Sequence, residues 1–262
     1  RVPGSTVREH LAAWRLAKAG PRQSIGDCLP VKGELWRRFW KPVIVSILNT
    51  EPAEASAQLL WAVLRETFGK GEAACRPMIA TQGLSETFVT PALRYLQDQG
   101  AEVKFNHRIR EIGFEGDRVI SIKGPSAIEL GVADSVILAV PPTGACQLLP
   151  GLRAPDAFQP IVNGHFQVDR DLGEASFLGL IGGTAEWLFV RDDVVSTTVS
   201  AAAELAEQSE AAIAQSLWKD IQKALDLGGM DMKAYRIIKE KRATFEQTPE
   251  QVGRRPGAMT GY

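Results

Sequence analysis

The stretch Ala133-Asp-Ser-Val-Ile-Leu-Ala-Val-Pro-Pro142 decides the class of fold that we expect for this sequence. Residues 135–140 are apolar almost throughout, which is typical of a strand buried on both faces of a sheet. The two prolines then end the strand, because proline has no backbone N–H to donate to a neighbouring strand. A strand of this kind, with helices around it, predicts a mixed α/β fold.

A helix is predicted upstream of this stretch. Thr90-Pro91 supplies an N-cap and a first-turn proline, with Ser85 as an alternative start one turn earlier, and Gly100 ends the helix. The residues expected on its buried side are Ala92, Leu93 and Leu96.

The first 70 residues are predicted to be almost entirely helical. Thr6 and Glu9 have the spacing of a capping box, in which each side chain accepts a hydrogen bond from the other residue's backbone N–H. A short helix over residues 34–40 is expected to stop at Lys41-Pro42, and a longer one is expected to open at Asn49-Thr-Glu-Pro52.

Strands are predicted in two groups. The first group comprises residues 102–105, 109–113 and 119–123, with a hairpin turn at Glu115-Gly-Asp117. The second group is an antiparallel sheet of residues 161–169, 177–182, 186–190 and 195–200, with turns at 171–173 and 191–193. A long helix with Ile213, Leu217, Ile221 and Leu225 on its apolar face follows, and residues 234–241 form a further strand.

Composition excludes several classes of function. Of the 262 residues, 45% are hydrophobic and 23% are charged, as in globular proteins. Thirty Lys and Arg against 31 Asp and Glu leave a net charge of −1, so no basic field marks a nucleic-acid-binding protein. No apolar run is long enough to span a bilayer. The three cysteines lack the spacing of a disulfide framework or a metal site, which suits a reducing compartment. The three histidines have no paired spacing, so they do not predict a metal site.

Two glycine-containing segments do not predict a phosphate site. Gly69-Lys-Gly71-Glu-Ala-Ala74 has the letters of a dinucleotide-binding motif, but it follows a helix, whereas that motif requires a preceding strand. Gly182-Gly183 better fits a turn between strands. The residues taken alone therefore predict an α/β protein with a helical lobe and assign it no chemistry.

Four segments occur in an order that resembles a known family. They are Thr81-Gln-Gly-Leu-Ser-Glu-Thr-Phe88, Tyr95-Leu-Gln-Asp-Gln-Gly-Ala-Glu-Val-Lys-Phe105, Ile109-Arg-Glu-Ile112 and the stretch that ends at Pro142. This order resembles the middle flavin-domain segment of the flavin-containing amine oxidase and carotenoid desaturase superfamily. The resemblance covers nearly the whole chain.

Further segments resemble the squalene-associated branch of that superfamily, the FAD-dependent hydroxysqualene dehydroxylases of hopanoid synthesis. They are Phe39-Trp-Lys-Pro-Val-Ile-Val-Ser-Ile-Leu-Asn-Thr50, Ala55-Ser-Ala57, Pro160-Ile-Val-Asn-Gly-His-Phe166, Glu186-Trp-Leu-Phe189 and Glu240-Lys-Arg-Ala-Thr-Phe245.

The sequence also departs from the family pattern. Members begin with a strand, a Gly-x-Gly-x-x-Gly turn and a helix that hold the FAD pyrophosphate, and they end with a second glycine-rich segment. Neither segment is present, so the resemblance implies the interior of such an enzyme without its two flavin-holding ends. We expect FAD in the parent enzyme but no tight retention by this chain. We also expect exposed strand edges that favour a homodimer.

The resemblance implies contacts to cofactor and substrate. The backbone of Ile109 would face the adenine, and Ala139 and Val140 would approach the dinucleotide; ordinary strand core is the alternative for all three. Trp187 and Phe189 would line the substrate cavity, where aromatic rings suit a polyprenyl chain and a passing carbocation. Their alternative is a pair of core aromatic residues on one strand.

His165 is the candidate catalytic residue. It lies in the run 161–168, which by resemblance approaches the flavin ring where amine oxidases often place a lysine; here Asn163 or His165 occupies that neighbourhood. Histidine has an ordinary pKa near ~6.5 and can supply a proton to a departing hydroxyl group. A histidine hydrogen-bonded within the sheet is the alternative.

The resemblance implies an FAD-dependent oxidoreductase that reductively dehydroxylates hydroxysqualene to squalene, in the cytoplasm or at the inner membrane. A flavin desaturase or amine oxidase is one alternative, and a cofactor-free module that binds lipid or a protein partner is another. The segments implied are a helical part of the substrate domain (1–76), the middle of the FAD-binding domain (77–145), the substrate-domain sheet and long helix (146–235), and a return strand and tail (236–262).

Overall fold

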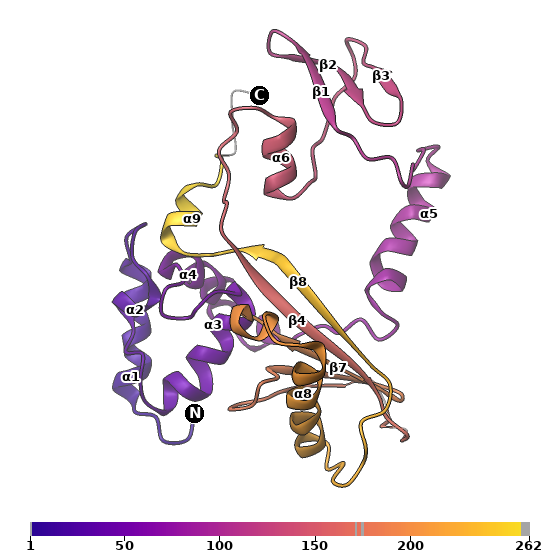
Figure 1. The fold of residues 1–262 in the computed structure, drawn as a ribbon. Coiled ribbons are helices and arrows are strands. Elements are labelled where there is room, and N and C mark those ends of the chain that lie inside the picture. Colours follow the sequence, from indigo (N-terminus) through magenta and orange to yellow (C-terminus); the bar gives the residue numbers. More distant parts are fainter. Residues whose placement is uncertain (1, 171, 174–175, 258–262) are drawn as a thin grey trace. The chain divides into compact units, whose positions relative to one another are not determined.

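The computed structural model describes residues 2–170, 172–173 and 176–257, which fold into two compact units (Figure 1). The first unit contains residues 2–75 and 155–254, and the second contains residues 76–154 and 255–257. Among these described residues no helix is long and apolar enough to cross a membrane. The same residues include no group of three or more His, Cys, Asp or Glu side chains placed to bind a metal ion.

The N-terminal part of the first unit is mainly helical, although irregular segments at 19–24, 29–33 and 49–56 make it less helical than predicted. Its elements are α1 (Val7–Leu11), η1 (Ala12–Lys18), α2 (Ile25–Cys28), η2 (Trp36–Trp40), α3 (Lys41–Leu48), α4 (Ala57–Glu66), η3 (Phe68–Lys70) and η4 (Glu72–Cys75). Thr6 caps α1 through both hydrogen bonds of the predicted capping box. The side chains of Leu16, Ile44 and Leu60 are fully buried in the cluster that holds these helices together.

The predicted helix end at Pro42 is wrong. Element η2 is a π-helical turn in which the Lys41 N–H donates to the Trp36 carbonyl, and α3 continues through Pro42 to Leu48. A proline ring normally clashes with the carbonyl four residues before it, and the wider π turn relieves that clash. The helical segment therefore passes through a residue that usually stops one.

The predicted helix start at Asn49 is also wrong. Asn49 ends α3 in the left-handed conformation with φ 42°, and Ser56 is the N-cap of α4. The Asn49 side chain donates to the Gln159 carbonyl and accepts from the Ala201 N–H. Contacts with distant segments thus fix this residue, and asparagine tolerates the left-handed conformation better than most residues.

A five-stranded antiparallel sheet makes up most of the rest of the first unit. Its strand order is β5 (Ser176–Gly179), β6 (Trp187–Arg191), β7 (Val194–Val199), β4 (Phe158–Gln167) and β8 (Tyr235–Phe245). This order confirms the predicted antiparallel sheet and its late strand. The turn predicted at 191–193 is confirmed, with Asp192 at φ 51°, whereas the turn predicted at 171–173 begins at Asp171, outside the described residues.

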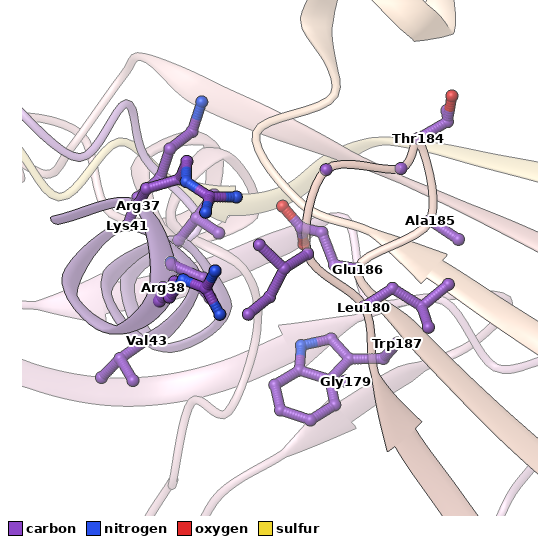
Figure 2. A pocket seen from close by; sticks show the side chains of 15 residues that line it. Arg37, Arg38, Lys41, Val43, Gly179, Leu180, Thr184, Ala185, Glu186 and Trp187 are labelled. Carbon is purple, nitrogen blue, oxygen red and sulfur yellow. The ribbon is translucent and has the colours of Figure 1, made fainter. Parts of the chain in front are cut away.

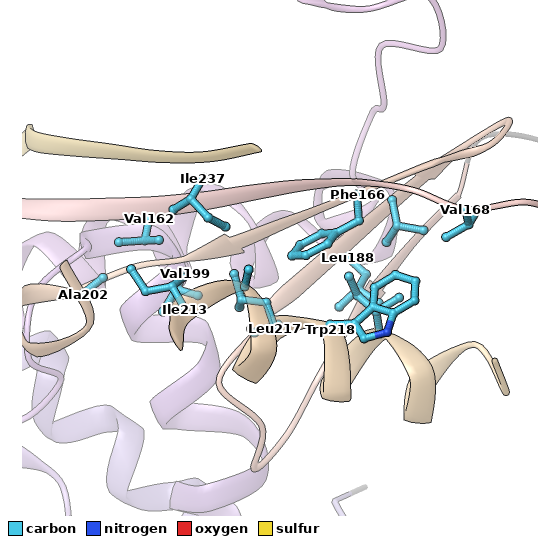
Figure 3. Packing of buried hydrophobic residues seen from close by; sticks show 14 of the residues in the cluster. Val162, Phe166, Val168, Leu188, Val199, Ala202, Ile213, Leu217, Trp218 and Ile237 are labelled. Atoms are coloured by element: carbon cyan, nitrogen blue, oxygen red, sulfur yellow. The ribbon is translucent and has the colours of Figure 1, made fainter. Parts of the chain in front are cut away.

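Helix α8 (Glu210–Ala224) covers one face of this sheet (Figure 3). Ile213, Leu217 and Ile221 are fully buried and pack with Val162 and Phe166 of β4. The predicted apolar face of the long helix is therefore confirmed. Two short helices, α7 (Ala203–Ala206) and α9 (Pro249–Gly253), precede α8 and follow β8.

The second unit combines helices with a small antiparallel sheet. Its elements are η5 (Ser85–Val89), α5 (Thr90–Asp98), β1 (Glu111–Glu115), β2 (Arg118–Lys123), β3 (Ala127–Glu129) and α6 (Pro142–Leu148). The turn at 115–117 joins β1 and β2 as predicted. The described residues thus form an α/β mixture, and the two sheets among them are antiparallel.

Two predicted strands of the second unit are not formed. Residues 102–105 and 135–140 pair with no strand among the described residues, and Ile137 is 91% exposed. A strand in the centre of a sheet needs a hydrogen-bonded neighbour on each side, and no described segment supplies one. The buried side predicted for α5 is also wrong, because none of that helix's residues is buried.

Candidate functional site

The side chains of strand β4 alternate between the face of the five-stranded sheet that α8 covers and the opposite face. Successive side chains of a strand point to opposite faces. Val162 and Phe166 are buried beneath α8, whereas Asn163 and His165, between and beside them, are only partly buried. We call the face that carries Asn163 and His165 the open face.

The strand register places one residue from each strand in a row across the open face. In the order of the strands, the first row is Phe177, Phe189, Ser196, His165 and Arg236. The adjacent row is Gly179, Trp187, Thr198, Asn163 and Ile238. Because directly paired residues share a face of the sheet, the structure brings the predicted residues His165, Trp187 and Phe189 together on one surface.

The polar part of the open face is held by hydrogen bonds between neighbouring strands. His165 Nδ1 lies 2.8 Å from Ser196 Oγ, and the Thr198 hydroxyl donates to Asn163 Oδ1 at 2.9 Å. Burial, and then the positive charge of Arg236, lower the pKa of His165 below its ordinary value. The imidazole is therefore fixed by a hydroxyl partner and is mainly neutral at pH 7.

The aromatic part of the open face lies on strands β5 and β6. The ring of Phe177 lies 5.7 Å from that of Trp187 and 6.2 Å from that of Phe189, measured between centroids. Phe189 is 40% exposed, and neither predicted ring belongs to the cluster buried beneath α8. These rings form an apolar surface beside the histidine.

A cavity of about 450 Å³ lies where Trp187 meets the helical part of the same unit (Figure 2). The β5–β6 connection, residues 179–187, forms one wall, and Arg37, Arg38 and Lys41 of η2 and α3 line the other. Val43, Val45 and Leu180 add apolar surface. Trp187 is thus shared between the open face and this cavity, whereas Phe189 and His165 do not line it.

A separate cavity of about 720 Å³ in the second unit contains all three residues predicted to contact FAD. Ile109, Ala139 and Val140 line it, together with His107 and Arg108. His107 Nε2 is buried and finds no hydrogen-bond partner among the described residues. A cavity with apolar residues, two arginine side chains and a ring nitrogen without a hydrogen-bond partner among the described residues fits a ligand with a flat ring and negative charge, such as a flavin dinucleotide.

The glycine pair Gly182-Gly183 is a turn, as predicted. The N–H groups of Thr184 and Ala185 donate to Asp220 Oδ2 at 2.6 and 2.9 Å. A Cβ at Gly183 would lie 2.8 Å from the same carboxylate. Glycine is required here because the backbone approaches a side chain of α8 closely.

Sequence reasoning missed several residues of these sites. Ser196 and Thr198 could have been found from the alternation of β7, where Val195, Thr197 and Val199 are buried, but only after the strand register was known. Arg37 and Arg38 gave no signal, because exposed arginines on a helix usually face solvent. His107 stands out only because its Nε2 atom is buried.

Residues 16–262 match the family described as flavin containing amine oxidoreductase, and the chain belongs to this family. The chain is 40% identical over 263 residues to hydroxysqualene dehydroxylase from Zymomonas mobilis and 37% identical over 262 residues to the enzyme of that name from Sinorhizobium fredii. In both comparisons the whole chain is covered, and it spans 63% of the relative's length.

Solved structures show the same fold at low sequence identity. A double mutant of putrescine oxidase matches with a TM-score of 0.68 and 14% identity, covering 93% of this chain and 63% of that one. A putative protoporphyrinogen oxidase from Exiguobacterium matches with a TM-score of 0.61 and 16% identity, covering 96% of this chain and 64% of that one. The predicted relation to the amine oxidase fold is confirmed.

Proposed function

We propose that this chain serves an FAD-dependent oxidoreductase that reductively dehydroxylates hydroxysqualene to squalene. The observation that supports this most is the open face, which combines an aromatic surface with a single partly buried histidine. The 37–40% identity to three hydroxysqualene dehydroxylases supports hydroxysqualene as the substrate.

The second unit provides the contacts for FAD. Ile109, Ala139 and Val140 would hold the dinucleotide in the cavity that they share, and the unpaired Nε2 of His107 would hydrogen-bond to it. FAD, when bound and reduced, supplies a hydride donor. In this proposal the second unit binds the cofactor and the first unit binds the substrate.

The open face would hold the isoprenoid and complete the reaction. The C–O bond of the allylic alcohol breaks, a proton from His165 allows the hydroxyl group to leave as water, and a hydride forms the new C–H bond. Positive charge that develops on the carbon is stabilised by the ring faces of Trp187 and Phe189. Ser196 orients the imidazole through Nδ1, which leaves Nε2 for the substrate.

The insolubility of the substrate suggests how the protein meets it. We propose peripheral contact with the cytoplasmic face of the inner membrane through the helical part of the first unit. Phe68 of this part is 52% exposed and could contact lipid, whereas Trp40 is 6% exposed and belongs to the core. Val7 and Leu11 of α1 add apolar surface, at 69% and 58% exposure. The outer strands β5 and β8 of the sheet are the edges proposed for a homodimer.

A graft tests this function. The 263 matching residues of the Zymomonas mobilis relative are replaced by this chain, and the purified graft is given hydroxysqualene and a flavin reductant. We expect squalene, identified by mass spectrometry, with one new hydrogen at the former hydroxyl carbon. A folded, flavin-containing graft that forms no squalene would contradict the assignment.

A further inference from the structure

Three basic side chains line one wall of the cavity beside Trp187, and the dehydroxylation uses none of them. Arg37 and Arg38 belong to the π turn η2, and Lys41 follows four residues after Arg37, so the three lie along one side of the helical segment (Figure 2). A neutral isoprenoid alcohol gives these cations no charge to pair with. The proposed substrate therefore does not account for the charge of this wall.

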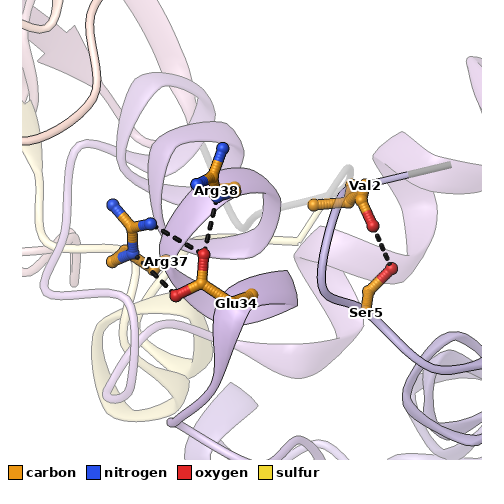
Figure 4. Close-up of polar contacts among 5 residues, drawn as sticks. All are labelled: Val2, Ser5, Glu34, Arg37 and Arg38. Carbon is orange, nitrogen blue, oxygen red and sulfur yellow. Dashed lines mark hydrogen bonds and ion pairs between the residues drawn. The ribbon is translucent and has the colours of Figure 1, made fainter.

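Glu34 holds the two arginines together without cancelling the charge of the wall. Its carboxylate accepts from Arg37 Nε at 3.1 Å and from Arg38 Nε at 2.6 Å (Figure 4). These hydrogen bonds lower the pKa of Glu34 to about 2, so it is ionised at neutral pH. A guanidinium group has five N–H donors, and each arginine therefore keeps donors for a ligand.

Glu186 supplies the carboxyl group that lines the cavity. Glu186 accepts from the Ser200 N–H at 2.9 Å. Burial raises the pKa of Glu186, while the hydrogen bonds from Ser200 and the charge of Lys41 oppose that shift. The lining of the cavity therefore contains three cationic side chains and one carboxyl group.

On the opposite wall, the N–H groups of Thr184 and Ala185 are already occupied by Asp220. The rest of the lining is largely apolar and includes Val43, Leu180 and Trp187. A charged wall beside an apolar one is complementary to a molecule that carries both kinds of group.

We propose that this cavity binds an amphiphile whose phosphate head group contacts Arg37, Arg38 and Lys41 while its apolar chain lies along Val43, Leu180 and Trp187. A volume of about 450 Å³ is within the usual range for small-molecule sites. This ligand goes beyond the proposed function, whose substrate is uncharged. An isoprenoid phosphate and a membrane phospholipid share this chemistry.

The test measures binding by the 262-residue chain without flavin. Calorimetry uses farnesyl phosphate below its micelle concentration, with farnesol and inorganic phosphate as comparisons, and sedimentation uses phosphatidylcholine vesicles with and without phosphatidylglycerol. We expect the phosphate-bearing amphiphile to bind at least about ten times more tightly than farnesol. An Arg37→Gln/Arg38→Gln variant should lose about tenfold or more in affinity, because charge-assisted hydrogen bonds are removed.

Matched variants make the result decisive. Arg65→Gln removes an exposed arginine that pairs with Glu66 outside the cavity, and it should bind as the parent chain does. If the double variant unfolds at a lower temperature, Lys41→Gln replaces it and should weaken binding several-fold. Charge-dependent binding of farnesyl phosphate alone assigns an isoprenoid phosphate, and charge-dependent binding of the anionic vesicles alone assigns a phospholipid. Equal binding of farnesol, no effect of the charge variants, or no binding of either probe would overturn the site.

Discussion

At the scale of single residues, His165 and its partners determine what the open face can do. Ser196 holds one ring nitrogen at 2.8 Å, and Arg236 is the paired residue on the neighbouring strand. The sequence predicts either a catalytic proton donor or a histidine that is hydrogen-bonded within the sheet, and the observed geometry is compatible with both. Enzyme kinetics of His165 variants are therefore needed to decide whether this residue donates a proton or has a structural role.

His165→Gln in the graft should slow squalene formation by roughly 100-fold or more while FAD stays bound, because a general acid contributes that much to a rate. The pKa of His165 is lowered by burial and by Arg236, so the protonated form is scarce at neutral pH. Turnover should therefore rise as the pH falls, with a midpoint below the ordinary histidine value. Steady-state rates between about pH 5 and 9 measure this.

Arg236→Gln supplies the control for that pH dependence. Removing the cation should move the midpoint to higher pH, because the charge of Arg236 lowers the pKa of His165. A purely structural His165 would give a profile that neither substitution shifts, or a His165→Gln variant with unchanged turnover.

At the scale of secondary-structure elements, the contact between β4 and α8 can be tested by a single substitution. A Cβ at Gly164 would lie 2.7 Å from Phe166 Cε2 and 2.9 Å from Leu217 Cδ1. Both side chains are fully buried and have little room to move. Gly164→Ala should therefore destabilise the chain by about 1–3 kcal/mol, measured by chemical denaturation.

Gly228→Ala is the matched control for that substitution. A Cβ there meets nothing within 4 Å, and we expect the free energy of unfolding to change by less than about 0.5 kcal/mol. Equal losses in the two variants would mean that β4 and α8 are not packed as described.

The elements that the sequence predicted well are those whose signal is local. Alternation in β4 and β7 and the helical spacing of Ile213, Leu217 and Ile221 depend only on neighbouring residues. Pro42 and Asn49 were misread because a π turn and long-range hydrogen bonds override the usual meaning of these residue types. The two rows of the open face required the strand register, which no local pattern contains.

At the scale of the whole molecule, the second unit shows where sequence patterns fail for a physical reason. Residues 135–140 have the composition of a central strand, yet a strand forms only with neighbours to pair with. Val136 and Val140 are 36% and 41% exposed. The apolar composition of residues 135–140 therefore suits the centre of a sheet, but the described residues contain no partner strand for this segment.

We expect the 262-residue chain to bind FAD only in the micromolar range or more weakly. Arg108 and Arg110 beside the cavity offset part of the pyrophosphate charge, but the sequence has no strand-borne Gly-x-Gly-x-x-Gly turn to bring backbone N–H groups close to it. The visible spectrum of the purified chain and a fluorescence titration with FAD measure this. A yellow protein with one flavin per chain would refute the expectation.

The most direct test of the central claim, that the open face binds the isoprenoid, is photolabelling of the 262-residue chain. A diazirine-bearing isoprenoid alcohol is irradiated with the protein, and the labelled peptides are identified by mass spectrometry, with unlabelled hydroxysqualene as competitor. We predict competable labels on the peptides of β4 and β6, around His165, Trp187 and Phe189, and a clear decrease in Trp187→Ala. Competable labels confined to α8, or to elements outside the five-stranded sheet, would contradict the claim.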